Sequence, residues 1–94
     1  MTNSTTKITK EFERVLKAFA NRRRLAIVQH LKKHHEATVG DIAETIELSL
    51  KATSKHLGIL FAADIVEREQ RSLQMWYSLS LNQKPASRSI INLL

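Results

Sequence analysis

The sequence predicts a small, mainly α-helical domain with a β-hairpin and an apolar tail after its helices. Three observations support this prediction. Apolar residues recur at helical spacing up to residue 63, their spacing changes to alternation after Asp64, and two of the helical segments are separated only by a tight turn. Because 94 residues suffice for one modest core, we expect a single domain over residues 1–94.

Two helices are expected first. Residues 1–7 are small and polar without periodicity, and we expect them to be flexible. From Ile8 the apolar residues fall on one helical face, which predicts an amphipathic helix that ends near Ala20. Asn21 is a preferred N-cap, so it is expected to begin a second helix, whose apolar residues repeat at three-residue steps as far as Leu31.

A short third helix and a longer fourth helix should follow. Thr38, with Asp41 three residues later, is similar to a capping box and predicts the start of the third helix. Only a tight turn fits before Ser49, which can cap a fourth helix over 49–63. The residues of this helix expected to point inward are Thr53, Leu57, Leu60 and Phe61. Two short helices joined by a tight turn are the helix-turn-helix signature.

The segment 65–80 has the alternation of two strands. Asp64 tolerates the left-handed conformation that would end the preceding helix. The strands are expected to meet at Arg71, Ser72 and Leu73, which makes a two-stranded wing. One face should carry Met75, Tyr77 and Leu79, and the other Trp76 and Ser78.

The last segment, 82–94, is too apolar to be left in water. Lys84 and Pro85 break the alternation, and Ser87 is expected to begin a final helix. Since the rest of the chain offers little to cover this segment, we predict that it dimerises together with the first helix. The predicted interface residues are Phe12, Leu16, Phe19, Ile90, Ile91 and Leu94. The alternative is that these residues belong to the core of a single chain.

Composition excludes several classes of function. The chain has no cysteine, which removes disulfides, thiolate metal sites and cysteine nucleophiles. Its apolar runs are too short to cross a membrane and its start lacks a signal peptide, so a cytoplasmic protein without a membrane partner is expected. The net charge of +6 favours a polyanionic partner, and residues 1–35 hold the excess.

The order of the predicted elements is that of a winged helix-turn-helix domain, and two stretches resemble the ArsR/SmtB-type repressors. FANRRRLAIV at 19–28 takes the place of a phrase such as LADPTRLRIL, with Arg24 and Leu25 matching. LSLKATSKHLGILFAADIV at 48–66 is similar to LSQSTVSRHLKVLREAGLV. The matching residues in this second stretch are Leu48, Ser49, Ser54, His56, Leu57, Leu60 and Val66. The likeness covers residues 10 to 81.

The resemblance implies a homodimer that binds an inverted repeat in DNA and regulates transcription, as a repressor. It also implies that the first and last helices form the interface. The family's metal sites do not carry over: EATVGDIAE has no cysteine, and LNQKPASRSIINLL has no Asp, His or Glu. We therefore expect no metal or other cofactor at those sites. His30 and His34 have a spacing that could hold zinc or nickel, but solvated histidines are favoured.

The recognition helix 49–63 is expected in the major groove, where its first turns must present short polar or cationic side chains. Lys51 and Ser54 are expected to read bases, Lys55 to contact bases or phosphate, and Leu50 to contact a thymine methyl. His56 should pack or touch the backbone. On the wing 65–80, the arginines could reach phosphate or the minor groove. The predicted DNA-binding residues are Ser49, Leu50, Lys51, Ser54, Lys55, His56, Arg68 and Arg71.

Other patterns have competing interpretations. Arg22 and Arg23 are assigned to solvent or phosphate, and one of the three arginines 22–24 to an acid or a helix cap. Gly58 in the recognition helix costs up to about 1 kcal/mol and is expected to permit close helix contact. An enzyme is not expected, because no Ser/His/Asp set or glycine loop is present. The remaining alternatives are a winged-helix protein-interaction module and a nonspecific DNA-binding protein.

Overall fold

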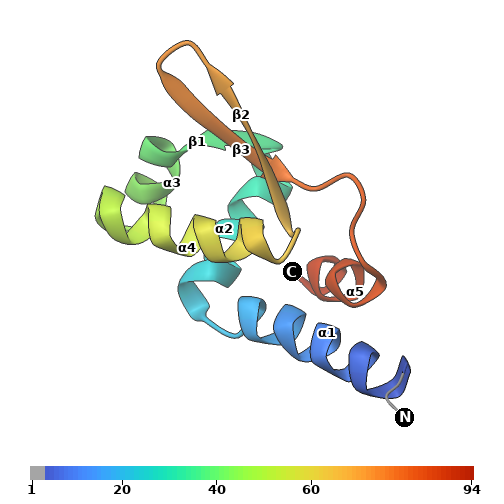
Figure 1. The fold of residues 1–94 in the computed structure, drawn as a ribbon. Helices are drawn as coiled ribbons and strands as arrows, with labels where there is room; N and C mark the ends of the chain where they lie inside the picture. Colours follow the sequence, from blue (N-terminus) through green and yellow to red (C-terminus); the bar gives the residue numbers. More distant parts are fainter. Residues whose placement is uncertain (1–3) are drawn as a thin grey trace.

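The structure, a computed structural model, describes residues 4–94 and confirms the predicted mainly α-helical fold with a wing (Figure 1). Its elements are α1 Ser4–Phe19, α2 Arg22–His34, β1 Glu36–Thr38, α3 Val39–Thr45, α4 Leu50–Ala62, β2 Val66–Arg71, β3 Gln74–Leu79 and α5 Pro85–Leu93. The wing projects from one end of the molecule, and α1 and α5 lie side by side at the other.

One hydrophobic cluster joins the helices to the base of the sheet. Its fully buried side chains come from α2, α3, α4 and the residue before β2, and they include Ile27, Leu31, Ile42, Leu57, Leu60 and Ile65. Burying each such side chain contributes about 1.5–3 kcal/mol relative to leaving it exposed. The hydrophobic core therefore holds the two helices of the helix-turn-helix in place.

The three predicted N-caps are confirmed. The Asn21 Oδ1 accepts from the backbone N–H groups of Arg23 and Arg24 at 2.9 and 3.1 Å. Thr38 accepts from the Asp41 N–H at 3.2 Å, and Ser49 accepts from the Ala52 N–H at 3.1 Å. Each bond satisfies a backbone donor that the first turn of a helix leaves unpaired.

Two left-handed residues shape the ends of α3 and α4. Glu47 has φ 54°, and the Leu48 N–H donates to the Ala43 carbonyl at 3.0 Å, which makes the tight turn of the helix-turn-helix. Asp64 has φ 60° as predicted, and the Ile65 N–H donates to the Leu60 carbonyl at 3.0 Å. Both ends are Schellman motifs without glycine.

The sheet has a strand that the sequence pattern did not predict. β1 joins the predicted hairpin in the order β1-β3-β2, with Glu36 opposite Ser78 and Thr38 opposite Trp76. Three residues are too few to show an alternating pattern, so β1 has no signature of its own. The Arg71–Gln74 register leaves Ser72, with φ 57°, and Leu73 as a two-residue turn.

The predictions for the two chain ends need correction. α1 begins at Ser4, so residues 4–7 are helical rather than flexible, and the rest of that prediction, residues 1–3, lies outside the described residues. α5 begins at Pro85, not at Ser87, because proline has the helical φ and lacks only an N–H that the first turn does not use. Ser87 is buried inside the first turn.

The predicted dimer residues divide into three sets by their exposure. Phe19 and Ile91 are 3% and 8% exposed, so they pack in the core of the single chain, contrary to the prediction that they face a partner. Phe12 and Leu16 remain 51% and 46% exposed. Ile90 and Leu94 are partly buried against the core.

Candidate DNA interface

The recognition helix α4 has one buried and one open face. Thr53, Leu57 and Leu60 are buried as predicted, whereas Phe61 is 37% exposed and lies at the edge of the core rather than inside it. The opposite face exposes Lys51, Ser54 and Lys55 together with Gly58. Polar and cationic side chains on such a surface are suited to contact base edges in a major groove.

Gly58 does not mediate the helix contact that its position suggested. Apart from its chain neighbours and the backbone of its own helix, a Cβ placed on Gly58 would meet no atom within 4 Å. The glycine therefore leaves bare backbone on the exposed face of α4, in line with Lys51 and Lys55.

The first turn of α4 carries two different predicted contacts. The hydroxyl oxygen of Ser49 is occupied by the cap, and its O–H remains free to donate to a phosphate or a base. Leu50 is 60% exposed, so its side chain is accessible for contact with a thymine methyl. Neither Lys51 nor Lys55 has a hydrogen bond or ion pair within residues 4–94.

His56 lies beside α1 and α2 rather than on the open face. Its Nδ1 is 3.1 Å from Nη1 of Arg24. Since a guanidinium only donates, Nδ1 must be the acceptor, and the imidazole is neutral with its proton on Nε2. Burial lowers the pKa of His56 below its usual range, and the nearby charges of Arg24, Arg23 and Lys55 lower it further.

This arrangement predicts a pH dependence of stability. Because the pKa of His56 is lower in the folded state than the ordinary 6.5, the unfolded chain binds more protons between the two values. Stability should therefore be complete above about pH 6.5 and fall as the pH drops toward the folded pKa. Urea unfolding at about pH 7.5 and about pH 5 measures it, and His56→Asn, which keeps an acceptor, should flatten the difference. An unchanged difference would show that His56 is not responsible.

His30 should contribute to the same pH dependence of stability. Its pKa is also lowered, first by burial and then by His34, so it contributes in the same direction. The double variant His30→Asn, His56→Asn should lose more of the pH dependence than either single variant.

Four cations from the basic N-terminal part bind the C-terminal carbonyls of other helices. Arg24 donates to Ala18 and Lys17 at the end of α1, at 2.6 and 3.1 Å. Arg23 donates to the Ile46 carbonyl at the end of α3, at 2.9 Å. Lys32 donates to the Ile91 carbonyl near the end of α5, at 3.0 Å, and Arg14 donates to the Ala62 carbonyl at the end of α4. A cation at the C-terminus of a helix donates to its last carbonyls and complements the helix dipole.

This finding corrects two sequence-based interpretations. Arg23 is not turned to solvent or phosphate, because it holds the turn between α3 and α4. Part of the basic excess in residues 1–35 is structural, so it says less about a polyanion than the net charge suggests. One signal could have revealed this: three arginines in the first turn of α2 oppose the dipole of that helix, which indicates partners elsewhere.

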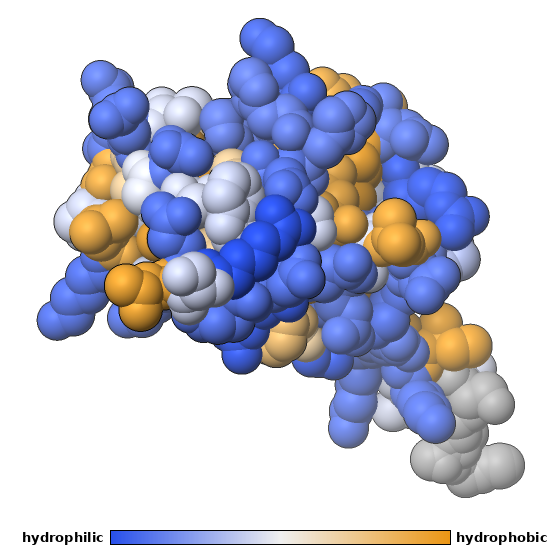
Figure 2. Space-filling model, turned by 90° about the horizontal axis from the view of Figure 1, so that it is seen from above, coloured by the Kyte–Doolittle hydropathy of each residue, from blue (hydrophilic) through white to orange (hydrophobic). Residues whose placement is uncertain are grey.

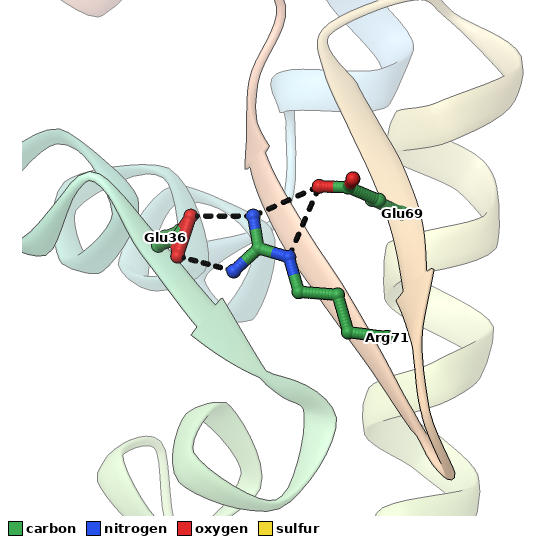
Figure 3. Close-up of polar contacts among 3 residues, drawn as sticks. All are labelled: Glu36, Glu69 and Arg71. Carbon is green, nitrogen blue, oxygen red and sulfur yellow. Dashed lines mark hydrogen bonds and ion pairs between the residues drawn. The ribbon is translucent and has the colours of Figure 1, made fainter.

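Both wing arginines already have partners in the protein. The guanidinium of Arg68 lies 4.0 Å from the centre of the Phe61 ring, which ties β2 to the end of α4. Arg71 pairs with Glu36 and Glu69 (Figure 3). The wing is therefore held by its arginines, and its freely exposed tip residue is Leu73, which is 96% exposed.

The His30 and His34 pair was the remaining candidate for metal binding. The His30 and His34 rings lie 4.6 Å apart, in an open pocket with Glu36, Asp41 and Glu44. Within residues 4–94, no three His, Asp, Glu or Cys side chains come together as metal ligands. These residues do not fit a metal ion as they stand.

The helix-turn-helix pair, its exposed cationic face and the wing together define a winged helix-turn-helix DNA-binding domain. Comparison with known proteins agrees. A family model described as a helix-turn-helix domain matches residues 19–69. Within the described residues 4–94, no helix has the length and apolar character needed to cross a membrane.

Three relatives extend this likeness. The transcriptional activator HlyU of Vibrio cholerae is 34% identical over 80 residues, which cover 85% of this chain and 73% of the relative. The arsenical resistance operon repressor of Bacillus subtilis is 28% identical and covers 85% and 76%. A homodimeric winged helix-turn-helix domain from Mycobacterium bovis superimposes with a TM-score of 0.84 at 26% identity, covering 99% of this chain and 82% of the other.

The chain belongs to the ArsR/SmtB-type family of winged helix-turn-helix transcriptional regulators. The resemblance stated from its sequence is thereby confirmed.

Proposed function

We propose that two copies of this chain bind an inverted repeat in double-stranded DNA and thereby regulate transcription. The exposed face of α4 is the observation that carries the proposal, because Lys51 and Lys55 lie there without partners while most other cations near the helix-turn-helix are occupied. In each half-site, α4 lies in the major groove. The contacts come from Ser49, Leu50, Lys51, Ser54 and Lys55.

His56 has a different part in this proposal. Its ring is turned to Arg24, which caps the end of α1. We therefore assign His56 to positioning α4 on the rest of the domain and not to base contact.

The second copy binds through α1 and α5. Ile8, Phe12 and Leu16 form a stripe on α1 that is 63%, 51% and 46% exposed, and Leu93 on α5 is 85% exposed. A shallow groove between the two helices is lined by Ile8, Phe12, Val15 and Pro85. Pairing two such surfaces removes exposed apolar area from water. The winged helix-turn-helix domain from Mycobacterium bovis is homodimeric, which supports self-association.

The surface character favours DNA over a protein partner on the wing side. Seen from above, hydrophilic side chains cover most of that face, and hydrophobic ones lie in separate patches (Figure 2). A protein-binding surface would need a continuous buried centre of low charge.

The relatives of the chain include an activator and a repressor. We therefore propose that the position of the binding site relative to the promoter determines whether the protein represses or activates transcription.

The salt dependence of binding tests this proposal. A dimer that neutralises about 6–10 phosphates should lose about 1,000-fold or more in affinity between about 50 and 200 mM salt. Fluorescence anisotropy with a labelled duplex at several salt concentrations gives the slope, and the stoichiometry should be two chains per duplex. Salt-insensitive binding, or one chain per duplex at saturation, would contradict the proposal.

A further inference from the structure

Arg71 joins all three strands of the sheet. It lies on β2, and it reaches across β3 to β1, where its two terminal nitrogens donate to the Glu36 carboxylate at 2.7 and 2.9 Å (Figure 3). On its own strand it donates to Glu69 at 3.0 and 2.8 Å. Its guanidinium also lies 5.1 Å from the centre of the Trp76 ring on β3. These residues share the outer face of the sheet.

This network leaves Arg71 few hydrogen-bond donors for a contact with DNA. The four hydrogen bonds to Glu36 and Glu69 use most of the five N–H groups of the guanidinium. Two carboxylates facing one guanidinium give the cluster a net negative charge, which repels a phosphate. The bond to Arg71 also lowers the pKa of Glu36, so this carboxylate stays ionised at neutral pH.

The position of Glu36 connects the network to the recognition elements. Glu36 begins β1 directly after α2, and β1 ends at Thr38, the N-cap of α3. A bond from Arg71 to Glu36 therefore fixes the wing to the strand that leads into the helix-turn-helix. On the opposite face of the sheet, the contact of Arg68 with the Phe61 ring fixes β2 to α4.

We propose that Arg71 is a positioning residue, which with Glu36 and Glu69 holds the wing at the angle to α4 that DNA binding requires and does not itself contact DNA. This inference rests on the proposed function and replaces the DNA contact predicted for Arg71. Losing the network loosens the part of the hairpin beyond residues 76–78, which β1 does not pair with, and ordering it again on DNA costs conformational entropy.

Alanine variants of the two partners test the proposal. Arg71→Ala, Glu36→Ala and the double variant are titrated with a duplex that the wild-type protein selects from a random pool. Each single variant should bind about fivefold more weakly, the upper range for an exposed ion pair, and the double variant should bind no more weakly than either single one. The salt slope should stay that of the wild type, since no phosphate contact is lost.

Glu67→Ala is the matched control. Glu67 lies on the same face of β2, and its carboxylate does not bind Arg71. Removing this negative charge should leave affinity unchanged or raise it slightly, so a loss with Glu36→Ala cannot be a general effect of charge. Thermal unfolding of every variant shows that the fold is retained.

Two results would overturn the proposal. If Glu36→Ala raises affinity while Arg71→Ala lowers both affinity and salt slope, Arg71 contacts phosphate and Glu36 restrains it. If neither variant changes affinity, the network does not position the wing for DNA.

A measurement without DNA separates this inference from the proposed function. Trp76 is the only tryptophan, so its emission reports on the guanidinium above its ring. Arg71→Ala and Glu36→Ala should shift that emission in the same direction. If the wild type binds no duplex, the proposed function and the role of the network in DNA binding both fail, and the emission alone decides whether the network exists.

Discussion

Reversing the charges of Lys51 and Lys55 together, as Lys51→Glu with Lys55→Glu, is expected to lower the affinity for the selected duplex by about 1,000-fold or more. This is the smallest usual difference between specific and nonspecific binding. Both lysines are exposed on α4, and the substitutions break no hydrogen bond or ion pair within residues 4–94. Each protomer would place two carboxylates where phosphates and base acceptors lie. Fluorescence anisotropy at one fixed salt concentration measures the change.

The control for this prediction has the same net charge as the Lys51→Glu, Lys55→Glu variant. Two lysines changed to glutamate lower the net charge of the chain by four, from +6 to +2. Lys7→Glu with Lys33→Glu makes the same change on α1 and α2, at exposed positions away from α4. This control should lose less than about tenfold, because only long-range attraction is reduced. Equal losses in both variants would show that overall charge, and not the face of α4, governs binding.

The second large effect is expected at the proposed dimer surface. Phe12→Glu with Leu16→Glu should raise the dimer dissociation constant by about 100-fold or more, because both side chains would carry a charge into a buried apolar contact. They are 51% and 46% exposed in the single chain, so the monomer should remain folded. Sedimentation equilibrium at tens of micromolar measures the mass, and circular dichroism measures the helix content.

Leu81→Glu separates a specific contact from general hydrophobic loss. Leu81 is 87% exposed but lies in the segment before α5, outside the stripe on α1. This variant should remain a dimer. A wild-type chain that sediments as a monomer would remove the basis of the prediction.

Cap chemistry explains why the starts of α2, α3 and α4 could be predicted. Asn21, Thr38 and Ser49 each accept from an N–H two or three residues later, so the whole interaction is contained in a few neighbouring residues. The change from helical to alternating spacing after Asp64 is equally local. These features carry the order of the elements and hence the family resemblance.

The missed features depend on partners far apart in the sequence. Arg23 binds a carbonyl 23 positions away, and Arg71 binds a carboxylate 35 positions away. No spacing rule indicates either pair, and β1 exists only because β3 provides an edge for it. The predicted role of Arg71 in DNA contact came from its place on the wing, which says nothing about the side chains around it.

The apolar face of α1 shows a third limit. Phe12, Leu16 and Phe19 fall on one stripe by periodicity, and the stripe is wide enough to serve both the core and a second surface. Only the packing of α1 on its neighbours separates buried Phe19 from exposed Phe12. Sequence alone therefore could not tell which residues of this stripe are buried in the single chain and which stay exposed.

In the proposed complex, α4 reads a DNA sequence as part of a dimer. The most direct measurement is to incubate the protein with a pool of random duplexes, sequence the retained DNA, and repeat this with the Lys51→Glu, Lys55→Glu variant. The wild-type pool should contain an inverted repeat, with half-sites about one helical turn apart, that is absent from the variant pool. Retained DNA without a common motif, or the same motif with the variant, would contradict it.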